Sequence, residues 1–103
     1  GTKKFNLAQS LFLYLEKVKD EDAFRRGLDV LMDITITEPI KGYRMGLSAY
    51  PLQLEKYYRE KNEKEMQQRT DLLKKKVQQL IDAETDPENK KSLKNMMKGG
   101  AEL

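Results

Sequence analysis

The stretch DVLMDITITEPIKGYRMG, residues 29–46, interrupts a helical pattern near the middle of the chain. Its ITIT segment is rich in β-branched residues, which disfavour helix slightly, although Thr is favourable at a helix N-cap. Pro39 is tolerated only in the first turn of a helix, where its missing N–H has no intrahelical partner. We therefore expect Thr37 to cap a new short helix that Gly46 ends or turns. The residues of this helix expected to face inward are Ile40 and Tyr43.

Two amphipathic segments precede the break. Apolar residues recur at helical spacing in residues 7–20, where the stripe is Leu7, Leu11, Leu15 and Val18. The second segment begins near DEDAF, residues 20–24, because acidic side chains suit a helix N-terminus. Its apolar stripe is Phe24, Leu28, Leu31 and Ile34. The short joint between the segments predicts that they pack as an antiparallel pair.

Three further helices are predicted after the short one. A fourth helix begins near Ser48 with Pro51 in an early turn, and a fifth runs from Asn62, in a capping-box-like pair with Glu65, to about Ala83. Pro87 can start a weak helix that ends near Met97. The fold class predicted is all-α, a compact right-handed bundle of about five helices over residues 1–84. A short C-terminal helix or tail follows over residues 85–103.

The composition narrows the chemistry available to the chain. It has 103 residues, enough for one domain, and contains neither Cys nor His. Disulfides, thiol nucleophiles, zinc fingers and His-based acid–base catalysis are therefore excluded. The acidic DEDAF segment lacks the alternating ligands and the Gly of a calcium loop, and no Gly-Lys-Ser/Thr follows GYRMG. We predict no catalytic residues, no bound metal and no cofactor. No apolar run approaches the roughly 18–20 residues of a membrane span.

The charge pattern leaves two interpretations open. Lys and Arg number 20 against 17 Asp and Glu, which gives a net charge of +3. A basic face could bind nucleic acid, but the two signs are interspersed as on helices that support themselves with pairs three or four residues apart. The Lys run of LLKKKVQQL, residues 72–80, is typical of a solvated helix face. We expect no direct nucleic-acid binding as the main role.

Tyr57 and Tyr58 are adjacent on a predicted helix, so both rings cannot face the core. At least one of them is expected to be exposed beside the turn into the fifth helix. Exposed aromatic side chains often mark a contact site.

The pattern as a whole resembles the TFIIS N-terminal domain family, also called the TND or LW domain, which includes the integrase-binding domain of LEDGF. LDVLMDITIT resembles the first part of the family pattern, YRMGLSAYPLQLEKYY the second, and NEKEMQQRTDLLKKKVQQLI the last. The similarity extends from about Leu7 to Ile81. The Leu-Trp pair of the family's last helix is absent, since the chain has no Trp, so the chain resembles a divergent member.

The resemblance implies a docking module and not an enzyme. In the family, the loops between helices one and two and between helices four and five bind short acidic, aromatic-bearing motifs from disordered regions of elongation proteins. The matching positions here are Val18, Lys19 and Asp20 in the first loop and Tyr57, Tyr58, Arg59 and Lys61 in the second. Val18 and Tyr58 would line one shallow apolar patch with basic side chains at its rim.

The expected partners are therefore disordered motifs of transcription elongation or chromatin proteins, and the expected location is the nucleus. The resemblance also implies a monomer without a small-molecule substrate or membrane attachment. Two alternatives remain: a small helical oligomerisation or adaptor protein that uses the long fifth helix, and a basic nucleic-acid-binding domain.

Overall fold

The computed structural model describes residues 2–102 and, among these, the side chains of residues 2–97. This part of the chain contains no strand and forms five α-helices and one short 3-10 helix. They are α1 (Thr2–Lys17), α2 (Glu21–Ile36), α3 (Lys41–Lys61), η1 (Lys64–Met66), α4 (Gln67–Ala83) and α5 (Pro87–Glu102). The predicted all-α bundle is confirmed.

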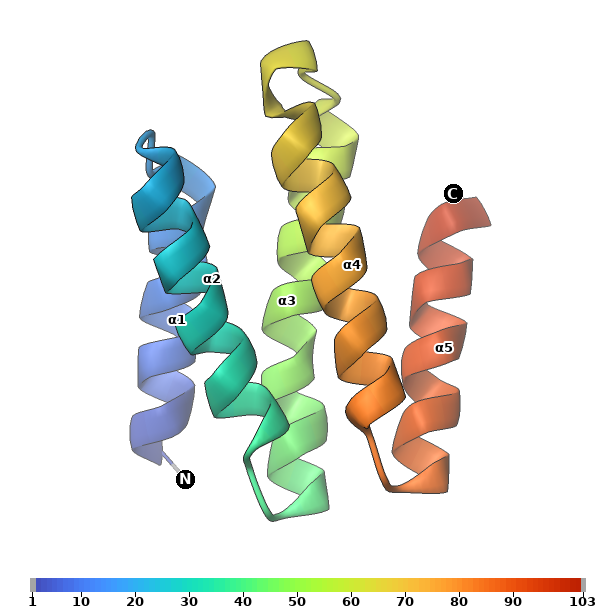
Figure 1. Ribbon diagram of the computed structural model, residues 1–103. Helices are drawn as coiled ribbons and strands as arrows, with labels where there is room; N and C mark the ends of the chain where they lie inside the picture. The colour runs from blue at the N-terminus through green and yellow to red at the C-terminus, as the bar shows by residue number, and fades with distance from the viewer. Residues whose placement is uncertain (1, 103) are drawn as a thin grey trace.

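Successive helices alternate in direction, so that each one returns along its predecessor (Figure 1). The central helix is α3, the longest at 21 residues, which packs against all four of the others. The hairpin of α1 and α2 lies on one side of α3, and α5 lies on the other side (Figure 1). The described chain measures 36 × 32 × 17 Å, so the bundle is a slab about two helices thick.

The main core fills the space among α1, α2, α3 and α4, because each of these helices turns one apolar stripe inward. Its buried members are Ala8, Leu15, Phe24, Leu28, Leu31, Met32, Leu47, Leu54, Tyr58, Leu73 and Leu80. A smaller cluster of Val77, Ile81 and Leu93 joins α4 to α5. The C-terminal helix predicted from Pro87 is thus formed and is anchored by the fully buried Leu93, but it runs to Glu102 and does not end near Met97 as predicted.

One expected apolar position of the first helix is wrong. Leu7 is 48% exposed, whereas Ala8 and Leu15 are fully buried. The helix begins at Thr2 and not near residue 7, and its contact with α3 uses Phe5 and Phe12, whose rings meet aromatic side chains of α3. Of the predicted stripe, Leu15 is therefore fully buried, Leu11 and Val18 are half-buried, and Leu7 lies at the edge of the buried face.

The predicted short third helix, and the separate fourth helix after it, are wrong because α3 continues through both Gly46 and Pro51. A Cβ atom on Gly46 would lie 3.0 Å from the ring of Phe5. Gly46 therefore lets α1 approach α3 closely and does not end a helix. Pro51 is buried inside α3, where its missing N–H removes one helical hydrogen bond without ending the helix.

The predicted N-cap role of Thr37 is also wrong. Thr37 ends α2, and its backbone N–H and its hydroxyl both donate to the carbonyl oxygen of Asp33, at 3.0 and 2.6 Å. The N-cap of α3 is Ile40, which is 53% exposed, and Tyr43 is 44% exposed, so neither faces inward as predicted. The break within residues 29–46 is therefore a tight turn of residues 37–40 between α2 and α3.

The predicted N-cap at Asn62 is a C-cap. Asn62 has a left-handed backbone with φ 50°, and its N–H donates to the carbonyl of Tyr58 at the end of α3. Asn is one of the few residues that adopt this conformation readily. The α4 helix then begins five residues later, after the 3-10 turn of η1.

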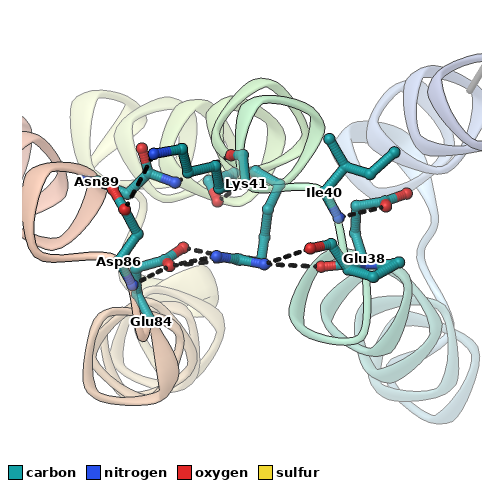
Figure 2. A network of polar contacts seen from close by, with 9 residues as sticks. Glu38, Ile40, Lys41, Glu84, Asp86 and Asn89 are labelled. Atoms are coloured by element: carbon teal, nitrogen blue, oxygen red, sulfur yellow. Dashed lines mark hydrogen bonds and ion pairs between the residues drawn. The ribbon is translucent and has the colours of Figure 1, made fainter.

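Arg44 ties together the two turns at one end of the bundle, the α2–α3 turn and the α4–α5 turn. Figure 2 shows this polar network, with Glu38 on one side of it and Glu84 on the other. Its Nε and Nη2 donate to the carboxylate of Glu84 at 2.9 and 2.7 Å. Its Nη1 donates to the carbonyl oxygens of Glu38 and Pro39 at 3.0 and 3.3 Å. Because Glu84 also accepts from the backbone N–H of Asp86 at 2.9 Å, one buried ion pair orders both turns.

The hydrogen bonds from Arg44 lower the pKa of Glu84 to about 2, although burial acts to raise it. A carboxyl with a lower pKa in the folded chain stabilises the fold above its ordinary pKa of 4.5, and this contribution is lost as the pH falls from 4.5 towards 2. We expect the loss to be roughly 2–3 kcal/mol. Urea unfolding across this pH range measures it.

The control for this prediction is Glu84→Gln, which removes the titrating group. The difference in unfolding free energy between the parent and Glu84→Gln should shrink as the pH is lowered through this range. A difference that stays constant from pH 7 to pH 2 would contradict the assigned role of the Arg44–Glu84 pair.

Candidate functional site

The opposite end of the bundle carries a pocket between the α1–α2 turn and the α3–α4 turn, which lie at the same end (Figure 1). We call it the turn pocket. Its volume is about 400 Å³, within the range of roughly 300–1,000 Å³ that ligand pockets span. It is lined by Glu16, Lys17, Val18, Lys19, Tyr57, Tyr58, Lys61, Glu63, Met66 and Arg69.

Most of the residues predicted to bind a partner line this pocket. The structure brings together Val18, Lys19, Tyr57, Tyr58 and Lys61, which come from turns about forty residues apart in sequence. Asp20 and Arg59 are not among the lining residues. The carboxylate of Asp20 caps α2 by accepting from the N–H groups of Asp22 and Ala23, at 2.8 and 3.2 Å. Arg59 pairs with Glu55 on its own helix at 3.1 Å.

Tyr58 is the buried wall of the pocket. Only 2% of the residue is exposed, and its hydroxyl donates to the carbonyl oxygen of Leu15 and accepts from Nη1 of Arg69 at 3.0 Å. Its ring packs edge to face with Phe24, with centroids 5.7 Å apart. Burial raises the pKa of its hydroxyl. The predicted exposed contact at Tyr58 is therefore an interior side chain that shapes the pocket from behind.

Tyr57 is the more accessible of the two tyrosines. Its ring stands edge to face against Tyr58 at 5.1 Å, and its hydroxyl donates to the carbonyl oxygen of Glu16 at 3.3 Å. The ammonium of Lys61 lies 4.9 Å from the centre of the Tyr57 ring, and the contact with Tyr57 raises the pKa of Lys61. One tyrosine thus faces the core and the other faces the pocket mouth, as adjacent helical positions require.

Arg69 holds the α1–α2 turn in place from the first turn of α4. The residue is 3% exposed, and its Nη1 and Nη2 donate to the carbonyl oxygens of Val18 and Lys19 at 2.7 and 3.0 Å. It also forms an ion pair with Glu21 at 2.7 Å. Its guanidinium lies 4.3 Å from the centre of the Phe24 ring. The floor of the turn pocket is therefore fixed by one buried guanidinium.

Nothing in the sequence distinguishes Arg69, because one Arg within a long polar helix is typical of a solvated face. Burial acts to lower the pKa of Arg69, and the hydrogen bonds to Glu21 and Tyr58 raise it by more. The guanidinium therefore stays charged, and its donors are engaged by the protein. The other missed lining residues are Glu16, Lys17, Glu63 and Met66.

The chemistry of the pocket suits an apolar side chain that has acidic neighbours. Val18, Tyr57 and Met66 supply apolar surface, while Lys17, Lys19 and Lys61 stand exposed around it. The pocket is lined by four basic and two acidic side chains, so its potential is positive on balance. Across residues 2–97, no three acidic side chains gather where they could hold a metal ion.

No protein-family model, curated protein or solved structure matches this chain. Within the described part of the chain, no helix is long and apolar enough to cross a membrane. The resemblance to the TFIIS N-terminal domain family stays a prediction, and the short third helix that contributed to it is not formed. A function for the chain must therefore be argued from the turn pocket itself.

Proposed function

We propose that this chain is a protein-interaction module whose turn pocket binds a short acidic segment of a disordered partner through an aromatic side chain. One observation carries the proposal. Two turns distant in sequence meet at a pocket with apolar walls and an exposed rim of Lys17, Lys19 and Lys61. That combination matches a ligand with an apolar anchor between carboxylates.

We expect the ligand to insert an aromatic side chain, because the accessible wall of the pocket is the aromatic ring of Tyr57. A ring entering the pocket would meet the Tyr57 ring and the flexible side chain of Met66, and both pack well against π-systems. The volume of about 400 Å³ accommodates one large side chain together with its neighbouring backbone. A disordered segment loses conformational entropy when it binds, so the affinity is expected to be modest and the complex reversible.

The exposed lysines act mainly on the rate of association. Exposed charges at the rim of an interface steer a partner of opposite sign, and their effect weakens as salt is added. Arg69 does not take part directly, because its donors are bound to Val18, Lys19, Tyr58 and Glu21.

The class of partner, the cellular location and the absence of catalysis are inferred from the family resemblance. It favours partners among disordered motifs of transcription elongation or chromatin proteins, a nuclear location, and a role without catalysis. The pocket geometry supports the docking of a short motif.

Charge reversal at Lys61 tests the proposal. An acidic peptide bearing two Phe residues should bind Lys61→Glu roughly tenfold more weakly than the parent, with slower association accounting for most of the change. Stopped-flow fluorescence of a labelled peptide separates the two rate constants.

The matched control is Lys94→Glu, which makes the same change in net charge at an exposed position of α5, remote from the turn pocket. It should leave the association rate close to that of the parent. Equal effects of Lys61→Glu and Lys94→Glu would show that the peptide responds to net charge and has no site at the turn pocket.

A further inference from the structure

The hairpin of α1 and α2 carries an exposed apolar surface along its outer edge. Leu7, Tyr14 and Val30 are 48%, 47% and 46% exposed, and between them lie the half-buried Leu11 and Ile34. We call these five residues the α1–α2 face. On α1, Leu7 and Tyr14 are two helical turns apart with Leu11 between them, so the three share one side of the helix. A contiguous exposed apolar surface of this kind is a candidate site of protein–protein contact.

The two helices contribute to this face at matching levels. A Cβ atom on Gly27 would lie 3.7 Å from the ring of Tyr14, so Tyr14 stands beside Gly27 where the helices approach closely. Because α1 and α2 are antiparallel, Leu11 then lies level with Val30. The face is therefore continuous across the groove between the helices, with Leu11 and Val30 at its centre.

The charges beside this centre are arranged symmetrically. Arg26 and Asp33 are exposed, four residues before and three residues after Val30, and lie on the same outer side of α2. Neither side chain forms an ion pair or hydrogen bond with another described residue. A twofold axis can lie in the plane of this face, perpendicular to both helices, at the level of Leu11 and Val30. Such an axis places Arg26 of one copy opposite Asp33 of the other.

The same axis sets the Leu7 side chain of one copy opposite Tyr14 of the other, because the two lie at nearly equal distances on either side of Leu11. A surface that is complementary to itself in both its apolar and its charged positions is what a twofold-symmetric interface requires. Lys3 and Lys17 are exposed at the two ends of α1, where solvent and salt screen their repulsion.

We propose that the α1–α2 face is the interface of a homodimer in which two hairpins pack antiparallel across this axis. The proposal replaces the monomer expected from the resemblance. It also differs from an oligomer built on the α4 helix, which is the alternative that the sequence suggested. The turn pocket lies at the end of the bundle, so a dimer leaves both pockets open for ligand.

Sedimentation equilibrium between about 10 µM and about 1 mM covers the affinities expected for such an interface. The parent chain should approach twice its mass of 12.0 kDa at the upper end of this range. The single variants R26D and D33R should each weaken dimerisation roughly tenfold, because each places like charges opposite one another twice in the dimer.

The double variant R26D/D33R provides the decisive comparison. It restores opposite charges across the axis, so its dimerisation constant should return to within about threefold of the parent value. Positions 26 and 33 are seven residues apart on one helix, a distance of roughly 10 Å that prevents pairing within one chain. Restoration therefore requires a second copy in the antiparallel arrangement.

Leu7→Ser combined with Tyr14→Ser removes the apolar part of the face and should give a monomer. The helical circular dichroism of this variant should equal that of the parent, since both residues are about half exposed. A parent chain that stays monomeric at every concentration, or a double variant as weak as the single ones, would overturn the proposal. Peptide binding at the turn pocket is measured on the same samples, and its result tests the proposed function independently of dimerisation.

Discussion

Replacing Arg69 with Ala should lower the free energy of unfolding by roughly 3–5 kcal/mol, because it removes the donor of three acceptors and each buried unsatisfied polar group costs about 1–3 kcal/mol. The change leaves the carbonyl oxygens of Val18 and Lys19 and the hydroxyl of Tyr58 without their donor. It also empties the space over the Phe24 ring, where the guanidinium packs at 4.3 Å. Three acceptors lose their donor at once, two of them in the α1–α2 turn, and so this turn should become mobile.

Urea denaturation followed by circular dichroism measures this loss. Arg69→Lys should recover only part of it, because an ammonium keeps the charge but cannot reach several acceptors at once as the planar guanidinium does. Arg25→Ala is the matched control, since Arg25 is exposed on α2, and its effect should stay within about 0.5 kcal/mol. An Arg69→Ala variant as stable as Arg25→Ala would show that Arg69 does not hold the turn.

Tyr58→Ala should cost roughly 3–5 kcal/mol, as truncation of a buried aromatic side chain does. The residue is 2% exposed and its ring packs against both Phe24 and Tyr57. Tyr58→Phe keeps the ring and removes the hydroxyl that bridges Leu15 and Arg69, so it should cost roughly 1–3 kcal/mol. The difference between the two variants separates packing from hydrogen bonding.

The family resemblance implies a different result, because it places Tyr58 at the surface for contact with a partner, where truncation would cost little stability. If thermal unfolding showed Tyr58→Ala to be as stable as the parent, that first interpretation would hold and the buried position would be wrong. Tyr57→Ala is the useful comparison, because Tyr57 is only half-buried and should matter more for ligand binding than for stability.

Helical periodicity predicted much of the fold. Phe24, Leu28 and Leu31 recur at helical spacing in the sequence and are fully buried in the structure. These positions are predictable because one side of an amphipathic helix must leave water, whatever the helix packs against. The helix that begins at Pro87 is predictable for a similarly local reason, because Pro is favoured in the first turn of a helix.

The errors share a physical cause: the role of a Gly, Pro or Asn depends on tertiary packing and backbone conformation as well as on local preference. Gly46 lies inside a helix because Phe5 of another helix needs its space, and that requirement comes from a residue 41 positions away. Pro51 costs α3 a hydrogen bond, yet burial on several sides keeps the helix continuous. Asn62 has two common roles at helix ends, and only the backbone conformation distinguishes them.

The candidate site was predictable in part. The resemblance placed Val18, Lys19, Tyr57 and Lys61 in two loops, and the antiparallel helices bring these loops to one end of the bundle. The role of Arg69 could not be predicted, because it depends on carbonyl oxygens about fifty residues away that only the folded chain brings within 3.0 Å. Likewise, the α1–α2 face becomes visible only once α1 and α2 are set side by side.

A titration of the isotope-labelled chain with the acidic two-Phe peptide, followed by NMR, tests the proposed docking site most directly. The largest amide shifts should fall on Val18, Lys19, Tyr57 and Lys61 as the peptide saturates the turn pocket, with the methyl group of Met66 shifting alongside them. The largest shifts on the exposed face of α4 at residues 74–76 would contradict the account, because the peptide would then bind a different surface.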